Sequence, residues 1–145
     1  MSVVDGTADA ADAVHVEGTS ISHAQRLGET EKLERSEGQD LGLRVLVGRR
    51  QAVVSSSDLG AKALAELVER AVAMARVVPE DPHCGLADPD AIARDWPDMD
   101  LSDPSEPTAE MLIDWARRTE EAARAVPGVT NSEGAEAGWS RSRVA

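Results

Sequence analysis

The sequence predicts an α+β fold: a four-stranded antiparallel meander covered by two helices, with a further C-terminal strand. Two kinds of hydrophobic periodicity support this class. Apolar residues at every second position indicate strands between residues 13 and 57, and apolar residues at intervals of three and four indicate helices over 57–78 and 108–126. Short turns that contain glycine separate the predicted strands. They favour antiparallel neighbours, because a parallel pair needs a long crossover connection.

Four segments of the first half are predicted to be the strands of the meander: residues 13–28, 30–37, 40–48 and 50–57. The clearest contains "DLGLRVLVG", whose alternating apolar residues share one face: Leu41, Leu43, Val45 and Val47. Three turns are expected between these strands, at Gly28–Glu29, Glu37–Gly38 and Gly48–Arg49.

Two amphipathic helices are expected to cover this sheet. The first begins after Asp58 or Gly60, either of which can cap it, and ends before Pro79. Its apolar stripe is Leu64, Leu67, Val68, Ala71, Val72 and Ala75. The second begins with Thr108 as its N-cap and ends before Pro127. Its expected buried stripe is Leu112, Trp115, Ala116, Ala122, Ala123 and Val126.

The remaining segments complete the expected domain. Residues 79–107 are rich in Pro and Asp and are predicted to form a loop held in place by Leu86, Ile92, Trp96 and Leu101. Residues 134–145 start as a strand with Ala135, Ala137 and Trp139 on one face. We expect residues 1–12 to be a flexible N-terminal end. We expect residues 13–145 to be a single α+β domain that belongs to something longer.

Charge and composition exclude several classes of function. The formal net charge of -12 over 145 residues repels a phosphate backbone, so nucleic-acid binding is not expected. No apolar stretch approaches the length that spans a membrane, and the N-terminus lacks the pattern of a secretory signal. Cys84 is the one cysteine, which excludes an internal disulfide framework. These features indicate a soluble protein of the cytoplasm.

The residue types that bind metals are not arranged in a recognisable pattern. His15 and His23 lie on the first predicted strand and are interpreted as strand surface residues rather than ligands. His83 and Cys84 are adjacent in the proline-rich loop and could offer two ligands, but structural zinc usually takes four. The sequence therefore predicts no metal site.

Candidate nucleophiles, acids and anion-binding residues also have ordinary structural explanations. Ser55–Asp58 precede a helix, where Ser and Asp act as caps. The acidic residues of the second strand are typical of a solvated face: Glu29, Glu31, Glu34 and Glu37. Arg49–Arg50 is interpreted as a turn dipeptide, and no glycine opens a phosphate-binding helix. We predict no catalytic and no cofactor-binding residue in this chain.

Longer stretches of the chain do resemble a known family. The segment "LERSEGQDLGLRVLVGRRQAVVSSSDL", followed by "ALAELVERAVAMARVVPEDPHCGLADP" and by "PGVTNSEGAEAGWSRS", is similar to the N-terminal domain of the TldD/PmbA family. The similarity covers nearly the whole chain from Ala11 and is closer to PmbA, also called TldE, than to TldD.

The resemblance implies a role in a heterodimeric zinc metallopeptidase that acts on unfolded peptides. The family is linked to microcin maturation, to antitoxin degradation and to the name "modulator of DNA gyrase". Its zinc-binding HExxxH helix belongs to TldD, and this sequence contains no such motif. The implied role is therefore that of a non-catalytic domain for subunit assembly and for lining the peptide chamber, with zinc in the partner or parent complex.

The implied partners are a TldD-type subunit and the C-terminal domain of the chain's own parent, and a peptide substrate is a further candidate. Trp139 and its strand are the expected contact with the parent domain, because an apolar strand left open needs a partner. An edge strand could also pair with an extended peptide. Two alternatives stay open: the N-terminal domain of a catalytic TldD-type subunit, and an independent hydrolase that uses His83 and Cys84 or a serine.

Overall fold

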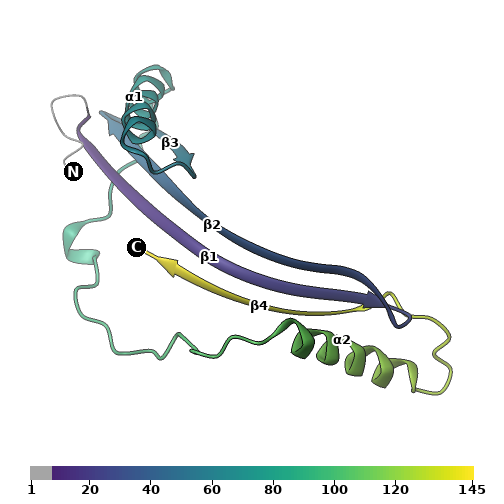
Figure 1. Cartoon of the computed structure of the whole chain (residues 1–145). Coiled ribbons are helices and arrows are strands. Elements are labelled where there is room, and N and C mark those ends of the chain that lie inside the picture. The colour runs from purple at the N-terminus through teal and green to yellow at the C-terminus, as the bar shows by residue number, and fades with distance from the viewer. Residues whose placement is uncertain (1–7) are drawn as a thin grey trace. The chain divides into compact units, whose positions relative to one another are not determined.

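The structure, a computed structural model, describes residues 8–145 and confirms the α+β class (Figure 1). Its elements are β1 (Ala10–Arg26), β2 (Glu29–Val47), β3 (Arg50–Ser56), α1 (Ala61–Val77), a 3-10 turn η1 (Pro89–Ala91), α2 (Ala109–Arg124) and β4 (Ala135–Val144). The four strands form one antiparallel sheet in the order β3-β2-β1-β4. Consecutive strands pair first as a meander, and the C-terminal strand joins next to β1.

The second and third predicted strands are a single strand, so the predicted turn at Glu37–Gly38 is wrong. β2 runs through Gly38 without a break. The real turns of the meander have glycines with positive φ, 86° at Gly28 and 58° at Gly48, and Gly38 has no such conformation. A glycine alone does not end a strand, because it also adopts extended backbone. The sheet keeps four strands because β4 is the fourth.

Contacts between Cα atoms group the chain into two compact units. The first unit contains residues up to Glu17, Gln39–Met99 and Val144–Ala145, and the second contains Gly18–Gly38 and Asp100–Arg143. Of the predicted flexible end, residues 1–7 lie outside the described residues. β1 begins at Ala10, within the rest of that end.

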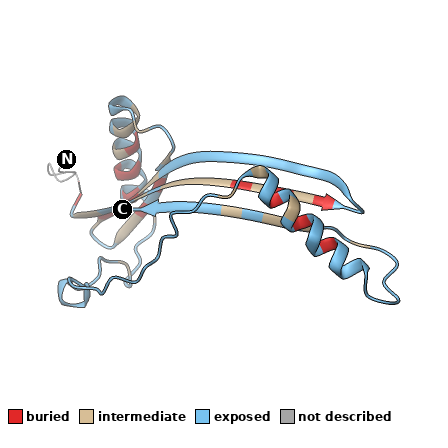
Figure 2. Ribbon diagram, turned by 60° about the horizontal axis from the view of Figure 1, so that its bottom comes forward, coloured by how far each residue is buried: buried red, intermediate tan, exposed pale blue. Residues whose placement is uncertain are grey.

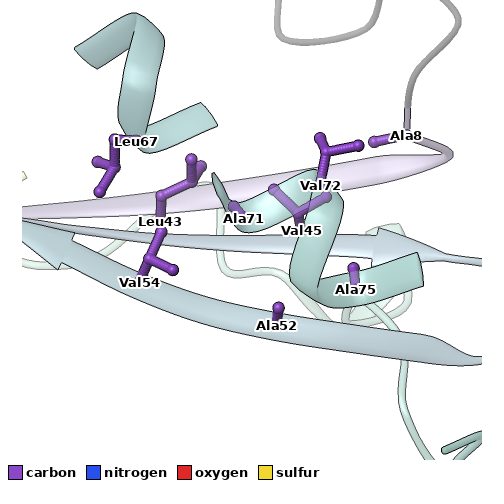
Figure 3. Packing of buried hydrophobic residues seen from close by; sticks show 9 residues of the cluster. All are labelled: Ala8, Leu43, Val45, Ala52, Val54, Leu67, Ala71, Val72 and Ala75. Carbon is purple, nitrogen blue, oxygen red and sulfur yellow. The ribbon is translucent and has the colours of Figure 1, made fainter. Parts of the chain in front are cut away.

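The first unit is built by α1 on β2 and β3 (Figure 3). β2 and β3 pair with Val45 opposite Ala52 and Leu43 opposite Val54, so these four side chains lie on one face. The α1 side chains that pack on them are Leu67, Ala71, Val72 and Ala75, as the periodicity predicted. Val45, Ala71 and Ala75 are fully buried. The two alanines let the helix backbone approach the sheet closely.

The second unit contains α2, whose buried face differs from the predicted one. Leu112, Ala116 and Glu120 are buried, at spacings of four residues (Figure 2). The rest of the predicted stripe is exposed: Trp115, Ala122, Ala123 and Val126. Trp115 and Ala122 lie on another side of the helix, whereas Ala123 is the penultimate residue of α2 and Val126 lies beyond its end. The predicted N-cap is confirmed, since Thr108 Oγ1 accepts a hydrogen bond from the Met111 N–H at 3.3 Å.

The loop of residues 79–107 is not held by its large apolar side chains, and this prediction is wrong. Leu86, Ile92, Trp96 and Leu101 are 47%, 57%, 70% and 82% exposed. Polar contacts hold its start instead. The Asp81 N–H donates to the Arg49 carbonyl at 2.7 Å, and the Arg50 guanidinium lies 3.0 Å from Glu80. The aspartates close local turns, as in the Asp88 carboxylate that accepts from the Asp90 N–H at the start of η1.

Candidate functional site

A buried carboxylate in the second unit binds the turn between β1 and β2. Glu120 is 2% exposed. Its two oxygens accept hydrogen bonds from the Leu27 N–H at 2.6 Å, from the Gly28 N–H at 2.9 Å and from Gln25 Nε2 at 3.0 Å. Leu27 and Gly28 both have positive φ, 52° and 86°, which makes this a tight two-residue hairpin turn. The turn aims two backbone donors in one direction, and the carboxylate of α2 satisfies both.

The charge of Glu120 is stabilised by these donors. The hydrogen bond from Gln25, aided by Ser132 and by the two turn amides, lowers the pKa of Glu120 from 4.5 to about 2, against the opposing effect of burial. Hydrogen bonds to the ionised form favour that form. Sequence reasoning missed this residue. Its position four residues after Ala116 and eight after Leu112 was the only signal for burial, and its hydrogen-bond donors lie more than 90 residues away in the sequence. The arrangement fixes a hairpin; it has the features of a structural site.

The predicted contact strand, β4, is an edge of the sheet. Its Trp139 ring lies under the Arg141 guanidinium, 5.0 Å from Cζ to the ring centroid, within the range of a cation–π contact. Arg141 Nη2 also donates to the Asp103 carbonyl at 3.2 Å and to the Pro104 carbonyl at 3.0 Å. Trp139 is therefore half-buried against a partner in its own chain, with the rest of its surface accessible.

The outward face of α2 carries a shallow depression of about 880 Å³. It is lined by residues of that helix alone: Trp115, Arg118, Thr119, Glu121 and Ala122. Trp115 is 43% exposed there. The depression combines the apolar surface of Trp115 and Ala122 with a charged rim formed by Arg118 and Glu121.

The structure does not bring the predicted metal-ligand candidates together. His23 is fully buried on β1 and neither ring nitrogen has a hydrogen-bond partner, so its interpretation as a surface residue is wrong. The Nε2 atom of His15 is also buried and has no hydrogen-bond partner. His83 and Cys84 lie in the loop, where the His83 N–H donates to Asp81 Oδ1 at 2.9 Å. Within residues 8–145, no three His, Cys, Asp or Glu side chains are placed to hold a metal ion.

The serine and charged candidates have structural roles. Ser56 Oγ accepts from the Asp58 N–H at 3.1 Å, and Asp58 Oδ1 accepts from the Gly60 N–H at 2.8 Å, so the segment forms the turn that leads into α1. Arg50 Nε donates to the Val78 carbonyl at 3.1 Å. The strand glutamates are exposed, and two of them form surface ion pairs, Glu34 with Lys32 and Glu37 with Arg35. The interpretation of this acidic run as a solvated face is confirmed.

These features define an α+β domain with an antiparallel four-stranded sheet and two helices. Residues 11–75 match the family model described as PmbA/TldA metallopeptidase domain 1. The chain belongs to the PmbA/TldD family and carries its N-terminal domain, as the resemblance indicated.

Two curated relatives support the family at the level of sequence. Metalloprotease PmbA of Escherichia coli O157:H7 is 36% identical over 135 residues, which cover 92% of this chain and 30% of that protein. The Metalloprotease PmbA homolog of Haemophilus influenzae is 36% identical over 121 residues, covering 83% of this chain and 26% of that protein. The chain thus spans about a third or less of the relatives that it matches.

Solved structures share the fold. TldE of Thermococcus kodakarensis superposes with a TM-score of 0.71 at 17% identity, covering 96% of this chain and 32% of that one. A protein of Bacteroides thetaiotaomicron that is named for modulation of DNA gyrase superposes with a TM-score of 0.76 at 19% identity, covering 94% and 31%. No helix among residues 8–145 has the length and hydrophobicity to cross a membrane.

Proposed function

We propose that this chain is the non-catalytic N-terminal domain of a PmbA/TldE-like subunit of a heterodimeric zinc metallopeptidase. Its role there is to assemble with a TldD-type subunit and to line the chamber that holds the peptide. The similarity to PmbA at 36% identity supports the type of subunit. The rest of a PmbA-like chain, more than two thirds of the relatives' length, supplies the C-terminal domain as the second proposed partner.

The zinc of the proposed peptidase does not fit this chain's own residues. His15 and His23 have buried ring nitrogens without partners, but no further ligand-type side chains complete a set around either one within residues 8–145. A catalytic zinc site takes three protein ligands. We therefore assign the zinc to the partner or to the parent complex, and we assign no step of peptide hydrolysis to residues of this domain.

The observation that carries the proposed assembly role is the exposure of large apolar side chains between residues 86 and 115. Trp96 is 70% exposed, Leu101 is 82% exposed and Met99 is 58% exposed. Aromatic residues and Met are enriched in protein–protein interfaces. Exposure of large apolar side chains to water is unfavourable, and burial against another protein removes this cost. These side chains are suited to be covered by another protein surface.

The charge and the expected compartment agree with this assignment. A net charge of -12 disfavours nucleic acid as the partner, so the "modulator of DNA gyrase" name in this family is not expected to reflect DNA binding by this domain. We place the protein in the cytoplasm, where unfolded peptides, microcin precursors and antitoxins would be available as substrates of the assembled peptidase.

Complex formation with a TldD-type subunit of the same organism tests the proposal. The chain and the subunit should co-elute in gel filtration, and Trp96→Ser together with Leu101→Ser should weaken the complex. The matched control is Val77→Ser, because Val77 is also 82% exposed but lies at the end of α1. If the double variant and the control bind equally well, these side chains are not the contact surface; if the unmodified chain forms no complex, the assembly role is wrong.

Metal analysis separates this proposal from the two alternatives. An independent hydrolase built on His83 and Cys84 would retain stoichiometric metal that is lost in His83→Ala, whereas the proposed domain should purify without it. A catalytic TldD-type parent would show an HExxxH motif in the sequence of the longer protein. Both curated relatives have PmbA in their names, which favours a PmbA-type parent over a TldD-type parent.

A further inference from the structure

We propose that the tip of the β1–β2 hairpin is a carboxylate-binding site that forms without α2, and that Glu120 is the ligand which occupies it. The ligand class is a carboxylate carried on a short aliphatic group. This inference is independent of the proposed function, because it concerns contacts within the second unit only. It implies that the site takes the carboxylate of another molecule when the Glu120 side chain is not in it.

The donors that converge on the carboxylate come from the hairpin and from the segment before β4. The Leu27 N–H, the Gly28 N–H and Gln25 Nε2 lie 2.6, 2.9 and 3.0 Å from its oxygens. The side chain of Ser132 makes a further hydrogen bond to it. Ser132 Oγ accepts from the Gly134 N–H at 3.0 Å, so its own O–H is available to donate. An ionised carboxylate has about four acceptor sites, which these donors match.

These donors are fixed by contacts that do not involve the carboxylate. The two turn residues have positive φ because they connect paired strands in a two-residue hairpin. Arg26 Nε donates to the Ser132 carbonyl at 3.1 Å and holds that residue beside the end of β1. A Cβ built on Gly134 would lie 2.7 Å from the Gln25 carbonyl oxygen, so the two backbones are in direct contact there. The donors should therefore keep their positions when the carboxylate is removed.

The helix should also stay docked without this carboxylate, because Leu112 and Ala116 are fully buried on the same face of α2. Glu120→Ala removes Cγ and the carboxyl group, which are the heavy atoms of acetate. Since Glu120 is 2% exposed, the space that its side chain leaves is enclosed by protein. Acetate is therefore the free ligand whose size and charge match the site.

The site should distinguish an ionised carboxylate from a neutral molecule of the same shape. Acetamide has an NH₂ group in place of one oxygen, and that group would meet further donors instead of acceptors. The same donors lower the pKa of Glu120 to about 2, as expected where hydrogen bonds favour the ionised form. The net charge of -12 repels small anions from the rest of the surface, so unspecific binding of acetate should be weak.

Thermal melts of Glu120→Ala at about pH 7, in sodium acetate and in sodium chloride of equal ionic strength, test the proposal. Acetate should raise the melting temperature by several degrees, increasingly with its concentration, because it binds the folded state only. Acetamide and chloride should not. The unmodified protein should show no such shift, since its own tethered carboxylate has a far higher effective concentration. Glu69→Ala is the matched control, because Glu69 is an exposed glutamate of α1, and it should not respond to acetate.

Nuclear magnetic resonance locates the bound acetate. In Glu120→Ala, the amide signals of Leu27 and Gly28 should move on titration with acetate and saturate as for a single site. If circular dichroism shows that Glu120→Ala does not fold in either salt, Glu120→Ser is the second variant. Its hydroxyl replaces the methyl group of acetate, so formate is then the matching ligand.

Several results would overturn the proposal. They are equal melting temperatures of Glu120→Ala in acetate and chloride, an equal gain with acetamide or in Glu69→Ala, and amide shifts that leave Leu27 and Gly28 unchanged. Failure of formate to stabilise Glu120→Ser, where that variant is needed, would do the same.

Discussion

Gln25 Nε2 donates a hydrogen bond of 3.0 Å to Glu120 Oε2, across 95 residues of sequence. Gln25 is the penultimate residue of β1, and Glu120 lies in the last third of α2. Together with the two amides of the following turn, this contact ties the hairpin tip to the helix. The second unit therefore depends on a polar anchor in addition to its apolar contacts, and removing the anchor should be detectable.

Glu120→Gln should destabilise the protein at neutral pH and flatten the acid limb of its stability curve. The folded-state pKa of about 2 lies below the ordinary value of 4.5, so the stability from this carboxylate is complete above about pH 4.5. It is lost as the pH falls toward 2. Thermal melts between pH 2 and pH 7 should show the two proteins several degrees apart at pH 7 and converging in acid.

Glu69→Gln is the control for this experiment, because Glu69 is an exposed glutamate of α1. It should melt within about a degree of the unmodified protein, as surface substitutions usually change stability by less than about 0.5 kcal/mol. A pH-independent gap between Glu120→Gln and the unmodified protein would contradict the role of the charge.

His23→Leu should leave the protein equally stable or more stable. The imidazole is fully buried and its two nitrogens have no hydrogen-bond partner, so no bond is lost on substitution. Removing the unsatisfied polar atoms should contribute about 1 kcal/mol or more. Urea titration monitored by tryptophan fluorescence measures this difference.

Gln25→Leu is the comparison for His23→Leu, since Gln25 is 5% exposed and has the same parity on β1. Here the substitution removes the donor to Glu120 and should be destabilising. If His23→Leu lost as much stability as Gln25→Leu, the result would contradict the absence of hydrogen bonds to the His23 imidazole.

The sequence was sufficient for the elements in which hydrophobic spacing alone decides burial. The alternating face of β2 from Leu41 to Val47 and the stripe of α1 from Leu67 to Ala75 both pack as predicted. In these elements each buried position is apolar, and the periods of strand and helix separate the faces. The turn at Gly28 was predicted correctly for the same local reason, a glycine that has a positive φ.

Prediction from the sequence failed where contacts between distant parts of the sequence determine which side chains are buried. Trp115 was expected to be buried because it is large and apolar, and Glu120 was not considered because it is charged. The structure reverses them, since the donors that make burial of Glu120 favourable lie more than 90 residues away in β1 and its turn. Hydrophobic periodicity contains no information about such partners.

Leu112→Ala should cost about 2–5 kcal/mol of unfolding free energy, because Leu112 is completely buried on α2 and the substitution leaves a cavity. Met111→Ala, one residue earlier and 45% exposed, should cost less than about 1 kcal/mol. Chemical denaturation of both variants measures the difference. Similar losses from the two substitutions would mean that α2 buries a different face from the one formed by Leu112, Ala116 and Glu120.

Leu27→Asn should stabilise the hairpin by about 1 kcal/mol, because Leu27 has a φ of 52°, a left-handed conformation that is costly for an apolar side chain and that Asn adopts more readily through local hydrogen bonds of its short polar side chain. The backbone N–H that binds Glu120 is unchanged, and Leu27 is already 46% exposed, so little burial is lost. Leu33→Asn is the matched control: Leu33 is 50% exposed but extended within β2, where Asn is unfavourable, and the same substitution should reduce stability. If Leu27→Asn raises the melting temperature and Leu33→Asn lowers it, the gain at Leu27 comes from the backbone conformation of the turn. If both substitutions lower the melting temperature, the apolar side chain of Leu27 contributes more to stability than its conformation costs.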